Sequence, residues 1–365
     1  MRKPWIATSA GEPLPSRVHN LMALKISDAD YEDWLARVKS LRQEVSDGRH
    51  MAICVRLTQL AKTGAETMDL KTIKAGSLEV AYLEAGPGDG WPCVMCHGFP
   101  YDVHAFGDVA PRLAAAGARV IVPYLRGYGP TRFLSADTRR SGEQAALASD
   151  LLALLDALAI PKAVVGGYDW GGRACCILSA LWPQRVVALV SGNSYNIQNI
   201  ARSLEPASAE REAAMWYQYY FHSERGRRGL AQNRREIARL LWKMWSPHWR
   251  FDDATFERTA AAFDNPDFVD IVIHSYRHRF GLVPGDPAMA HIETRLVVQP
   301  PISVPAITID GDADGVNSGT AHHASKFTGL HQHRVFKGAG HNPPQERPAE
   351  WLQAVLDVRA MAATV

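Results

Sequence analysis

The chain has 365 residues, of which 47% are hydrophobic, enough to bury a sizeable core. Lysine and arginine (40) nearly balance aspartate and glutamate (38), and no basic tract argues for nucleic acid. The longest apolar runs are shorter than the roughly 20 residues of a membrane helix, and the N-terminal stretch lacks the apolar region of a secretory signal. We therefore expect a cytoplasmic protein without nucleic-acid or membrane partners, while a homodimer stays open.

The first part of the chain, residues 1–67, is expected to form a helical leader. Ser27 can cap a helix; it precedes acidic residues and then apolar residues at helical spacing up to Leu41. We expect this segment to pack against other parts of the protein.

From Met68 onward the pattern changes to short apolar runs separated by amphipathic stretches. Between several of these runs lie helical patterns, of which the clearest has leucines at helical spacing after a capping box formed by Ser141 and Gln144. Apolar strands that alternate with amphipathic helices predict a mostly parallel sheet covered on both faces. The expected strands are Ser77–Gly86, Cys93–Cys96, Ala118–Tyr124, Ala163–Gly167, Val186–Gly192, Val304–Gly311 and His333–Gly338.

A helical block interrupts this alternation. Residues 197–296 are mostly helical and rich in tryptophan, tyrosine and arginine, and the strand pattern returns afterwards. One helix, ending before Pro247, is expected to present Ile237, Leu240, Leu241, Met244 and Trp245 on one face. We therefore expect a core domain of residues 68–196 and 297–365, with residues 197–296 as a cap over the carboxyl ends of the strands, where pockets lie in such sheets.

No cofactor or metal site is expected. Cys93 and Cys96 have C-x-x-C spacing, but they stand inside an apolar run and no second pair exists, so buried strand cysteines are the favoured reading. The histidines after residue 320 match no familiar zinc spacing.

Three segments that follow expected strands each supply one reactive group. The window Gly167-Tyr168-Asp169-Trp170-Gly171 has the layout of a nucleophile elbow, with aspartate where serine usually stands. Asp314 follows the strand that ends near residue 310, and His341 follows the last strand. The order is nucleophile, acid, histidine; Asp310 and Asp312 compete with Asp314 for the role of the acid.

Four motifs carry a family resemblance: HGFP (residues 97–100), YDWGG (168–172), GDAD (311–314) and GHNPPQE (340–346). With them the chain resembles the epoxide hydrolase and haloalkane dehalogenase branch of the α/β-hydrolase superfamily. This resemblance implies a central sheet of about eight strands, with helices on both faces and a helical cap inserted after the sixth strand. It implies Asp169 as nucleophile, His341 as general base and Asp314 as the residue that orients the histidine.

The same resemblance implies the surroundings of the nucleophile. Backbone N–H groups of Phe99 and Trp170 would form the oxyanion hole, and the Phe99–Pro100 bond would be cis. A carboxylate suits this chemistry, because it is already ionised at neutral pH and needs no base to attack a saturated carbon. Water would then attack the resulting ester with the help of His341.

Two lid tyrosines separate the possible reactions. Soluble epoxide hydrolases place two tyrosines over the nucleophile, and the segments WYQYYF and HSYRHRFG put Tyr217 and Tyr276 at the matching positions. We therefore expect an epoxide hydrolase that acts on a small-molecule epoxide with water. Candidate pocket residues are Phe106, Trp216 and Phe221.

Two alternatives remain at this point. Trp242, Trp245 and Trp249 could supply a halide clamp, which would make the protein a haloalkane or haloacid dehalogenase with the same Asp-His-Asp set. A ligand-binding protein that has lost its catalytic serine is the other alternative, although it predicts decay at the partner positions.

Overall fold

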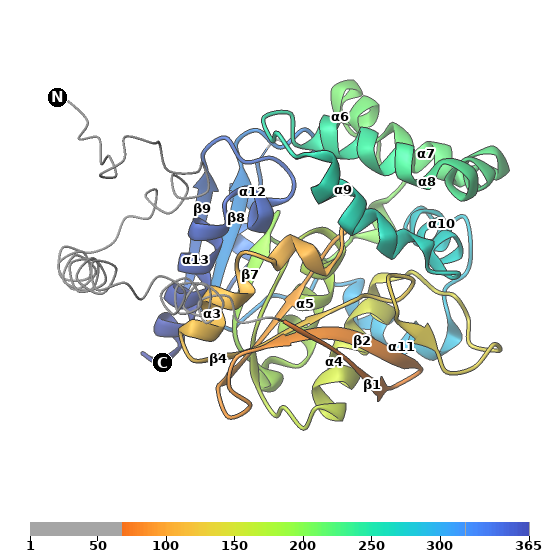
Figure 1. Ribbon diagram of the computed structural model, residues 1–365. Coiled ribbons are helices and arrows are strands. Elements are labelled where there is room, and N and C mark those ends of the chain that lie inside the picture. The colour runs from red at the N-terminus through yellow and green to blue at the C-terminus, as the bar shows by residue number, and fades with distance from the viewer. Residues whose placement is uncertain (1–67, 318, 365) are drawn as a thin grey trace, which may run out of the picture. The chain divides into compact units, whose positions relative to one another are not determined.

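The computed structural model describes residues 68–317 and 319–364, so the expected leader lies outside the described residues. A single sheet forms the centre of this part of the chain, with eight strands in the order β1-β2-β4-β3-β6-β7-β8-β9 (Figure 1). The strands from β4 to β9 along this order run parallel, and β2 is antiparallel to β1 and β4. The eight strands are β1 (Asp69–Ala75), β2 (Leu78–Ala85), β3 (Trp91–Cys96), β4 (Ala118–Pro123), β6 (Ala163–Gly167), β7 (Val186–Gly192), β8 (Ala306–Gly311) and β9 (His331–Phe336).

The expected strands are present, and two were missed. Strand β1 is mostly exposed and contains Lys71 and Lys74 among its seven residues, so it lacks an apolar run. The two-residue β5 (Arg132–Phe133) pairs with Leu78 and Glu79 at the start of β2. Cys93 and Cys96 are free and fully buried in β3, as the sequence predicts.

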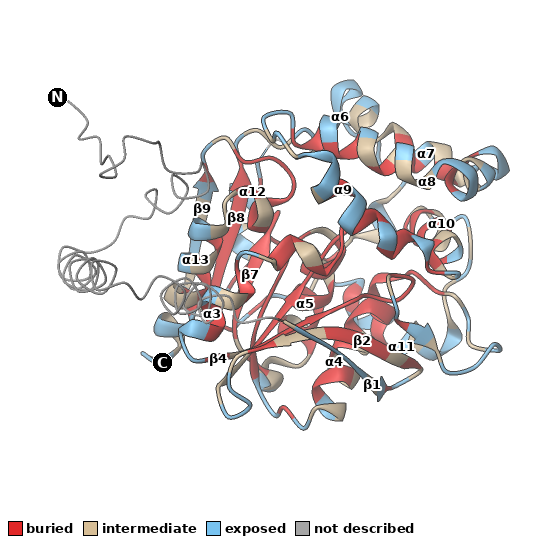
Figure 2. Ribbon diagram, viewed as in Figure 1, coloured by how far each residue is buried: buried red, intermediate tan, exposed pale blue. Residues whose placement is uncertain are grey.

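Helices cover the sheet in two layers. Helices α4 (Gln144–Ala157) and α5 (Asp169–Leu181) pack together on one side, and α3 (Ala110–Ala115) and α13 (Pro348–Ala362) lie on the other (Figure 1). The central strands are buried between the two layers, and most of α5 is buried as well, as Figure 2 shows.

The start of α4 differs from the predicted capping box. The helix begins at Gln144, and Glu143 is its N-cap without a side-chain hydrogen bond to the helix. The hydroxyl of Ser141 donates to Glu143 Oε1 over 2.6 Å, and the Gln144 side chain contacts the backbone of Gln198 instead. Tertiary contacts therefore replace the local cap.

A helical insertion separates β7 from β8, and β7 is the sixth of the eight strands in chain order. The C-terminal end of α8 contacts the loops at the carboxyl ends of three strands. Trp242 Nε1 donates to Pro100 O after β3 (2.8 Å), and Trp245 O accepts from Gly315 N–H after β8 (3.0 Å) and His341 N–H after β9 (3.2 Å). The insertion comprises α6 (Ala209–Ala214), α7 (Trp216–His222), α8 (Glu224–Trp245), α9 (Asp253–Ala260), α10 (Phe268–His278) and α11 (Ala290–Leu296).

The predicted buried face of α8 was partly wrong. Leu241 and Trp245 are buried as expected, but Leu240 and Met244 are exposed. Trp242 is buried instead, because its ring stacks on Trp249 and on Tyr101 of the core. The buried face is therefore rotated toward Trp242.

Candidate active site

A sharp turn between β6 and α5 presents Asp169. Its backbone has a φ of +50°, a left-handed conformation that typically costs a non-glycine residue about 1–3 kcal/mol. Close packing needs glycine on both sides of it: a Cβ on Gly171 would lie 2.0 Å from Cys96 O, and one on Gly98 would lie 2.6 Å from the Asp169 Cβ. The turn therefore presses the first residue of α5 against the loop after β3.

That loop supplies a hydrogen bond to the nucleophile. Phe99 N–H donates to Asp169 Oδ1 over 2.8 Å, and the Phe99–Pro100 bond is cis, as expected. Trp170 follows Asp169 in the first turn of α5, and its fully buried indole lies 5.7 Å from the Phe99 ring. The role of the Trp170 backbone N–H as the second donor of the oxyanion hole stays a prediction.

His341 and Asp314 form the second part of the site. His341 Nδ1 lies 2.9 Å from Asp314 Oδ2. The side chain of Asp314 is buried, and it also accepts hydrogen bonds from Val316 N–H (2.7 Å), from the side chain of Asn193 (3.0 Å) and from the backbone and side chain of Asn317 (both 3.2 Å). Burial opposes the charge of Asp314, but His341, Val316 N–H and Asn317 outweigh it and lower the pKa of the carboxyl.

Asp310 and Asp312, the competing acids, lie elsewhere. Asp310 accepts from the backbone N–H (2.6 Å) and hydroxyl (2.7 Å) of Thr320, and Asp312 lies 3.3 Å from Lys337 Nζ. The structure therefore brings Asp314 to His341. Asn193, which the sequence did not single out as a functional residue, comes directly after β7 and reaches Asp314 from that side.

Asp169 and His341 lie in ion-pair contact, with Asp169 Oδ2 3.9 Å from His341 Nε2. Burial alone would raise the pKa of Asp169, but His341 and Arg173 outweigh it and lower the value to about 2. Burial alone would lower the pKa of His341, but Asp314 and Asp169 raise it to about 10. The free site therefore holds a carboxylate beside an imidazolium at neutral pH.

The two predicted tyrosines pack against each other, and Tyr217 lines the same cavity as Asp169 whereas Tyr276 does not. Tyr217 on α7 and Tyr276 on α10 have ring centroids 5.3 Å apart, and the Tyr276 ring lies 5.4 Å from that of Phe99. Burial raises the pKa of both phenols, and the charge of Asp169 adds to the effect. Both hydroxyls therefore stay protonated at neutral pH, and Tyr217 Oη accepts from Gln218 Nε2 (3.0 Å), which leaves its own proton free to donate.

A cavity of about 930 Å³ opens onto these groups, with Asp169, Tyr217 and His341 in its wall. The three aromatic residues proposed for the pocket are not in that wall. Phe106 packs on Tyr168 and Trp351. Trp216 packs on Tyr217 and Tyr220, and Phe221 lies behind the site against Phe99 and Tyr276.

Two arginines in the cavity wall were missed by the sequence reasoning. Arg173 stands one turn after Asp169 on α5, and Arg279 follows α10. The i,i+4 spacing from Asp169 was a signal for Arg173. No local pattern distinguishes Arg279 from the other arginines of the insertion.

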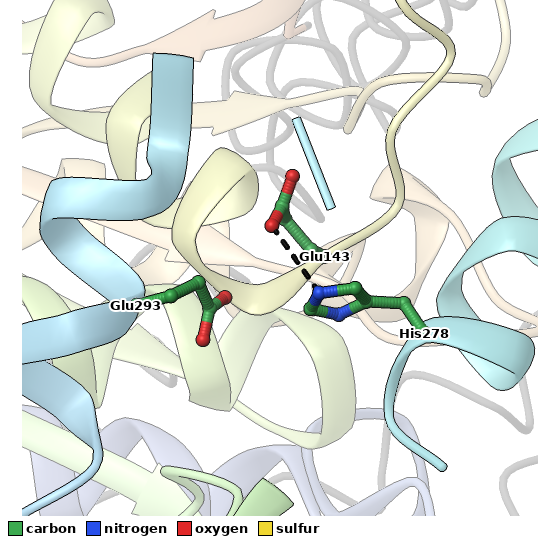
Figure 3. A group of neighbouring side chains, drawn as sticks. All are labelled: Glu143, His278 and Glu293. Atoms are coloured by element: carbon green, nitrogen blue, oxygen red, sulfur yellow. Dashed lines mark ion pairs between the residues drawn. The ribbon is translucent and has the colours of Figure 1, made fainter. Parts of the chain in front are cut away.

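A separate cluster of titratable side chains joins the core to the insertion. Glu143, His278 and Glu293 have ligand atoms within 4.8 Å of one another (Figure 3). His278 Nε2 lies 3.5 Å from Glu143 Oε2. Glu143 Oε1 also accepts from Asp286 N–H (2.8 Å), and Glu293 Oε1 accepts from Ala145 N–H (3.1 Å). We therefore interpret these side chains as a contact between α4, α10 and α11.

Comparison with known proteins agrees with the fold. A model of the alpha/beta hydrolase fold family matches residues 92–348. The structure of a candidate epoxide hydrolase from Klebsiella pneumoniae is 47% identical, covers 80% of this chain and 97% of its own, and superposes with a TM-score of 0.79. The chain therefore belongs to the α/β-hydrolase family, in its epoxide hydrolase branch.

Curated relatives carry names from the same branch. Epoxide hydrolase A from Mycobacterium tuberculosis is 26% identical over 328 residues, which is 80% of this chain and 97% of that protein. Bifunctional epoxide hydrolase 2 from Sus scrofa is 29% identical over 188 residues, 51% of this chain but 32% of that protein. The matches to the mammalian proteins thus span about a third or less of their length. Within the described residues, no helix is both long and apolar enough to cross a membrane.

Proposed function

We propose that this protein hydrolyses an epoxide to a vicinal diol through a covalent ester on Asp169. The observation that carries the proposal is the set of groups around one carboxylate. Phe99 N–H donates to Oδ1, His341 Nε2 lies 3.9 Å from Oδ2, and Tyr217, which packs on Tyr276, lines the same cavity. The carboxylate lies in the wall of a cavity that is large enough for a small substrate.

In the first step, an Asp169 oxygen attacks a carbon of the ring, the C–O bond breaks, and Tyr217 or Tyr276 protonates the oxygen that is released. A phenol is a suitable donor to a developing alkoxide. The proton that the tyrosine has lost is restored from the imidazolium of His341, which becomes neutral.

In the second step, neutral His341 takes a proton from water, which attacks the ester carbonyl. The oxyanion forms on the former carboxylate, where Phe99 N–H already donates a hydrogen bond to an oxygen. Collapse of this intermediate releases the diol and regenerates Asp169 and the imidazolium. Protons balance over the two steps, and Asp314 keeps Nδ1 of His341 occupied, so that Nε2 faces the reaction.

The charge change on Asp169 couples the two steps. The Asp169 carboxylate is one of the groups that raise the pKa of His341 in the free site. Ester formation removes that charge, so the pKa of His341 falls when a neutral base is needed. The same electrostatic pair thus favours imidazolium before ring opening and imidazole after it.

Halide displacement would need free N–H donors facing the leaving group. Trp242 Nε1 is occupied by Pro100 O, and Trp249 stacks on Trp242. Trp170 and Trp245 have indole nitrogens without a hydrogen-bond partner among the described residues, but neither residue lines the cavity. Tyr217, which lines the cavity together with Asp169, therefore favours epoxide opening, whereas Tyr276, like Trp170 and Trp245, lies outside the cavity wall.

Turnover of neutral probes tests this assignment. We expect diol formation from styrene oxide by the wild type and its loss in Asp169→Asn, with no halide release from a haloalkane panel. Halide release without any epoxide turnover would reverse the assignment.

A further inference from the structure

Two largely buried arginines, Arg173 and Arg279, line the same cavity as the nucleophile. Arg279 is 7% exposed, and its hydrogen bonds go to the backbone oxygen and hydroxyl of Ser275 (3.3 and 3.2 Å). Arg173 Nη2 lies 3.7 Å from Asp169 Oδ2, and its Nη1 is buried without a hydrogen-bond partner among the described residues. Of these two guanidinium groups, Arg173 contacts the Asp169 carboxylate, and Arg279 has hydrogen bonds to Ser275 alone among the described residues.

Burial of these two guanidinium groups costs free energy in the free protein. A buried charge is stable only when it is paired or well hydrogen-bonded. Burial lowers the pKa of Arg279 to about 10, and the neighbouring charge of Arg173 adds to this effect. An anion placed between the two guanidinium groups would remove this penalty.

The wall of the cavity as a whole also carries more positive than negative charge. Besides the imidazolium of His341, its charged residues are five cations (Arg173, Arg202, Arg211, Arg279 and Lys326) and three carboxylates (Asp169, Glu205 and Glu212). Glu205 is paired with Arg202, and Glu212 accepts from Tyr219 Oη and Ala207 N–H. The unpaired charge of the wall is therefore mostly positive, which attracts anions into the cavity.

On the basis of the proposed function, we infer that the substrate is an epoxide that carries a carboxylate. Arg279 and Arg173 bind this carboxylate beside Asp169. The two arginines offset the repulsion between an anionic substrate and the anionic nucleophile. Once Asp169 is esterified, the substrate carboxylate is the negative charge that remains next to both guanidinium groups. Arginine suits this role because its planar donors match a carboxylate.

A purely structural role for Arg279 makes a different prediction. Its guanidinium lies 4.2 Å from the centre of the Tyr276 ring, so the side chain also supports that tyrosine. Loss of this support would slow all epoxides equally. Loss of a carboxylate site would slow anionic substrates selectively and mainly through KM.

The test compares 3-phenylglycidate with its methyl ester, which differ in one negative charge. We expect the wild type to have the higher kcat/KM for the carboxylate. Arg279→Met should lower the ratio of the two kcat/KM values by about 30-fold, the range of a charged hydrogen-bonded contact. Arg228→Met, at an exposed position of α8 outside the cavity, should keep the wild-type ratio. Equal losses for both substrates in Arg279→Met would overturn the inference.

A binding measurement separates this inference from the proposed function. By calorimetry, cinnamate should bind more tightly than methyl cinnamate, and Arg279→Met should remove the difference. If this holds while neither glycidate is hydrolysed, the carboxylate site stands and the epoxide assignment fails. If styrene oxide is hydrolysed but cinnamate has no advantage over its ester, the carboxylate site is wrong and the epoxide assignment stands.

Discussion

Asp169 and His341 hold opposite charges 3.9 Å apart, and the proposed reaction removes one of these charges and then restores it. The pKa of Asp169 is about 2, and the pKa values of the two tyrosines are raised. We therefore expect the rate of ester formation, measured by rapid quench with excess enzyme, to be constant between about pH 5 and pH 9.

Ester hydrolysis should depend on pH differently. It needs neutral His341, so its rate should rise with pH and level off above the pKa of His341 in the ester. A decline of ester formation below pH 6, with flat ester hydrolysis, would contradict the roles given to the two residues.

Removal of the base should stop the reaction after its first half. His341→Gln is expected to form the ester on Asp169 and to hydrolyse it slower by about 10²–10⁴-fold, the usual contribution of a general base. Mass spectrometry of the intact protein would detect the added mass of the epoxide. The absence of any adduct in His341→Gln, with Asp169 intact, would contradict a covalent route.

The elbow is the element on which the site depends, because α5 begins where β6 and β3 meet. Cys96 pairs with Gly167 across β3 and β6, and a Cβ at Gly171 would enter the space of Cys96 O. We expect Gly171→Ala to lower the free energy of unfolding in urea by about 1–3 kcal/mol or more.

Gly88→Ala is the matched control, since nothing lies within 4 Å of a Cβ at that position. It should leave the free energy of unfolding unchanged or raise it by up to about 1 kcal/mol. Similar effects of both substitutions would mean that the elbow is less tightly packed than the structure shows.

The local sequence was sufficient to predict the site residues where a motif itself determines the position of the side chain at the end of a strand. The segments around Asp169, Asp314 and His341 each follow a strand, and parallel strands bring their carboxyl ends to one edge. The face of α8 was partly wrong because Trp242 is buried by partners far away in sequence, among them Tyr101. Arg279 was missed for the same reason: only packing of the insertion on the core decides which arginine faces the cavity.

At the scale of the molecule, Glu293 links α11 of the insertion to α4 of the core. Burial raises the pKa of its carboxyl to about 6, although Gln144 and Ala145 donate to it. The folded protein then binds more protons than the unfolded chain between about pH 4.5 and 6. Stability is therefore lost as pH rises through this window, by about 2 kcal/mol for a shift of this size.

Glu293→Gln keeps an acceptor for the Ala145 N–H and removes the titration. Its free energy of unfolding relative to the wild type should increase by up to about 2 kcal/mol between pH 4.5 and pH 7. Glu236→Gln, at an exposed position, should show little such change. A difference between Glu293→Gln and wild type that does not vary with pH would show that the carboxyl is not perturbed.

The covalent ester on Asp169 is the central claim, and the source of the oxygen in the first diol tests it most directly. Excess enzyme is mixed with a substoichiometric epoxide in heavy-oxygen water, and the diol from a single turnover is examined by mass spectrometry. We expect unlabelled diol, because its new oxygen comes from the Asp169 carboxylate while the solvent oxygen stays on the protein. Heavy oxygen in the first-turnover diol would show direct attack by water and contradict the ester mechanism.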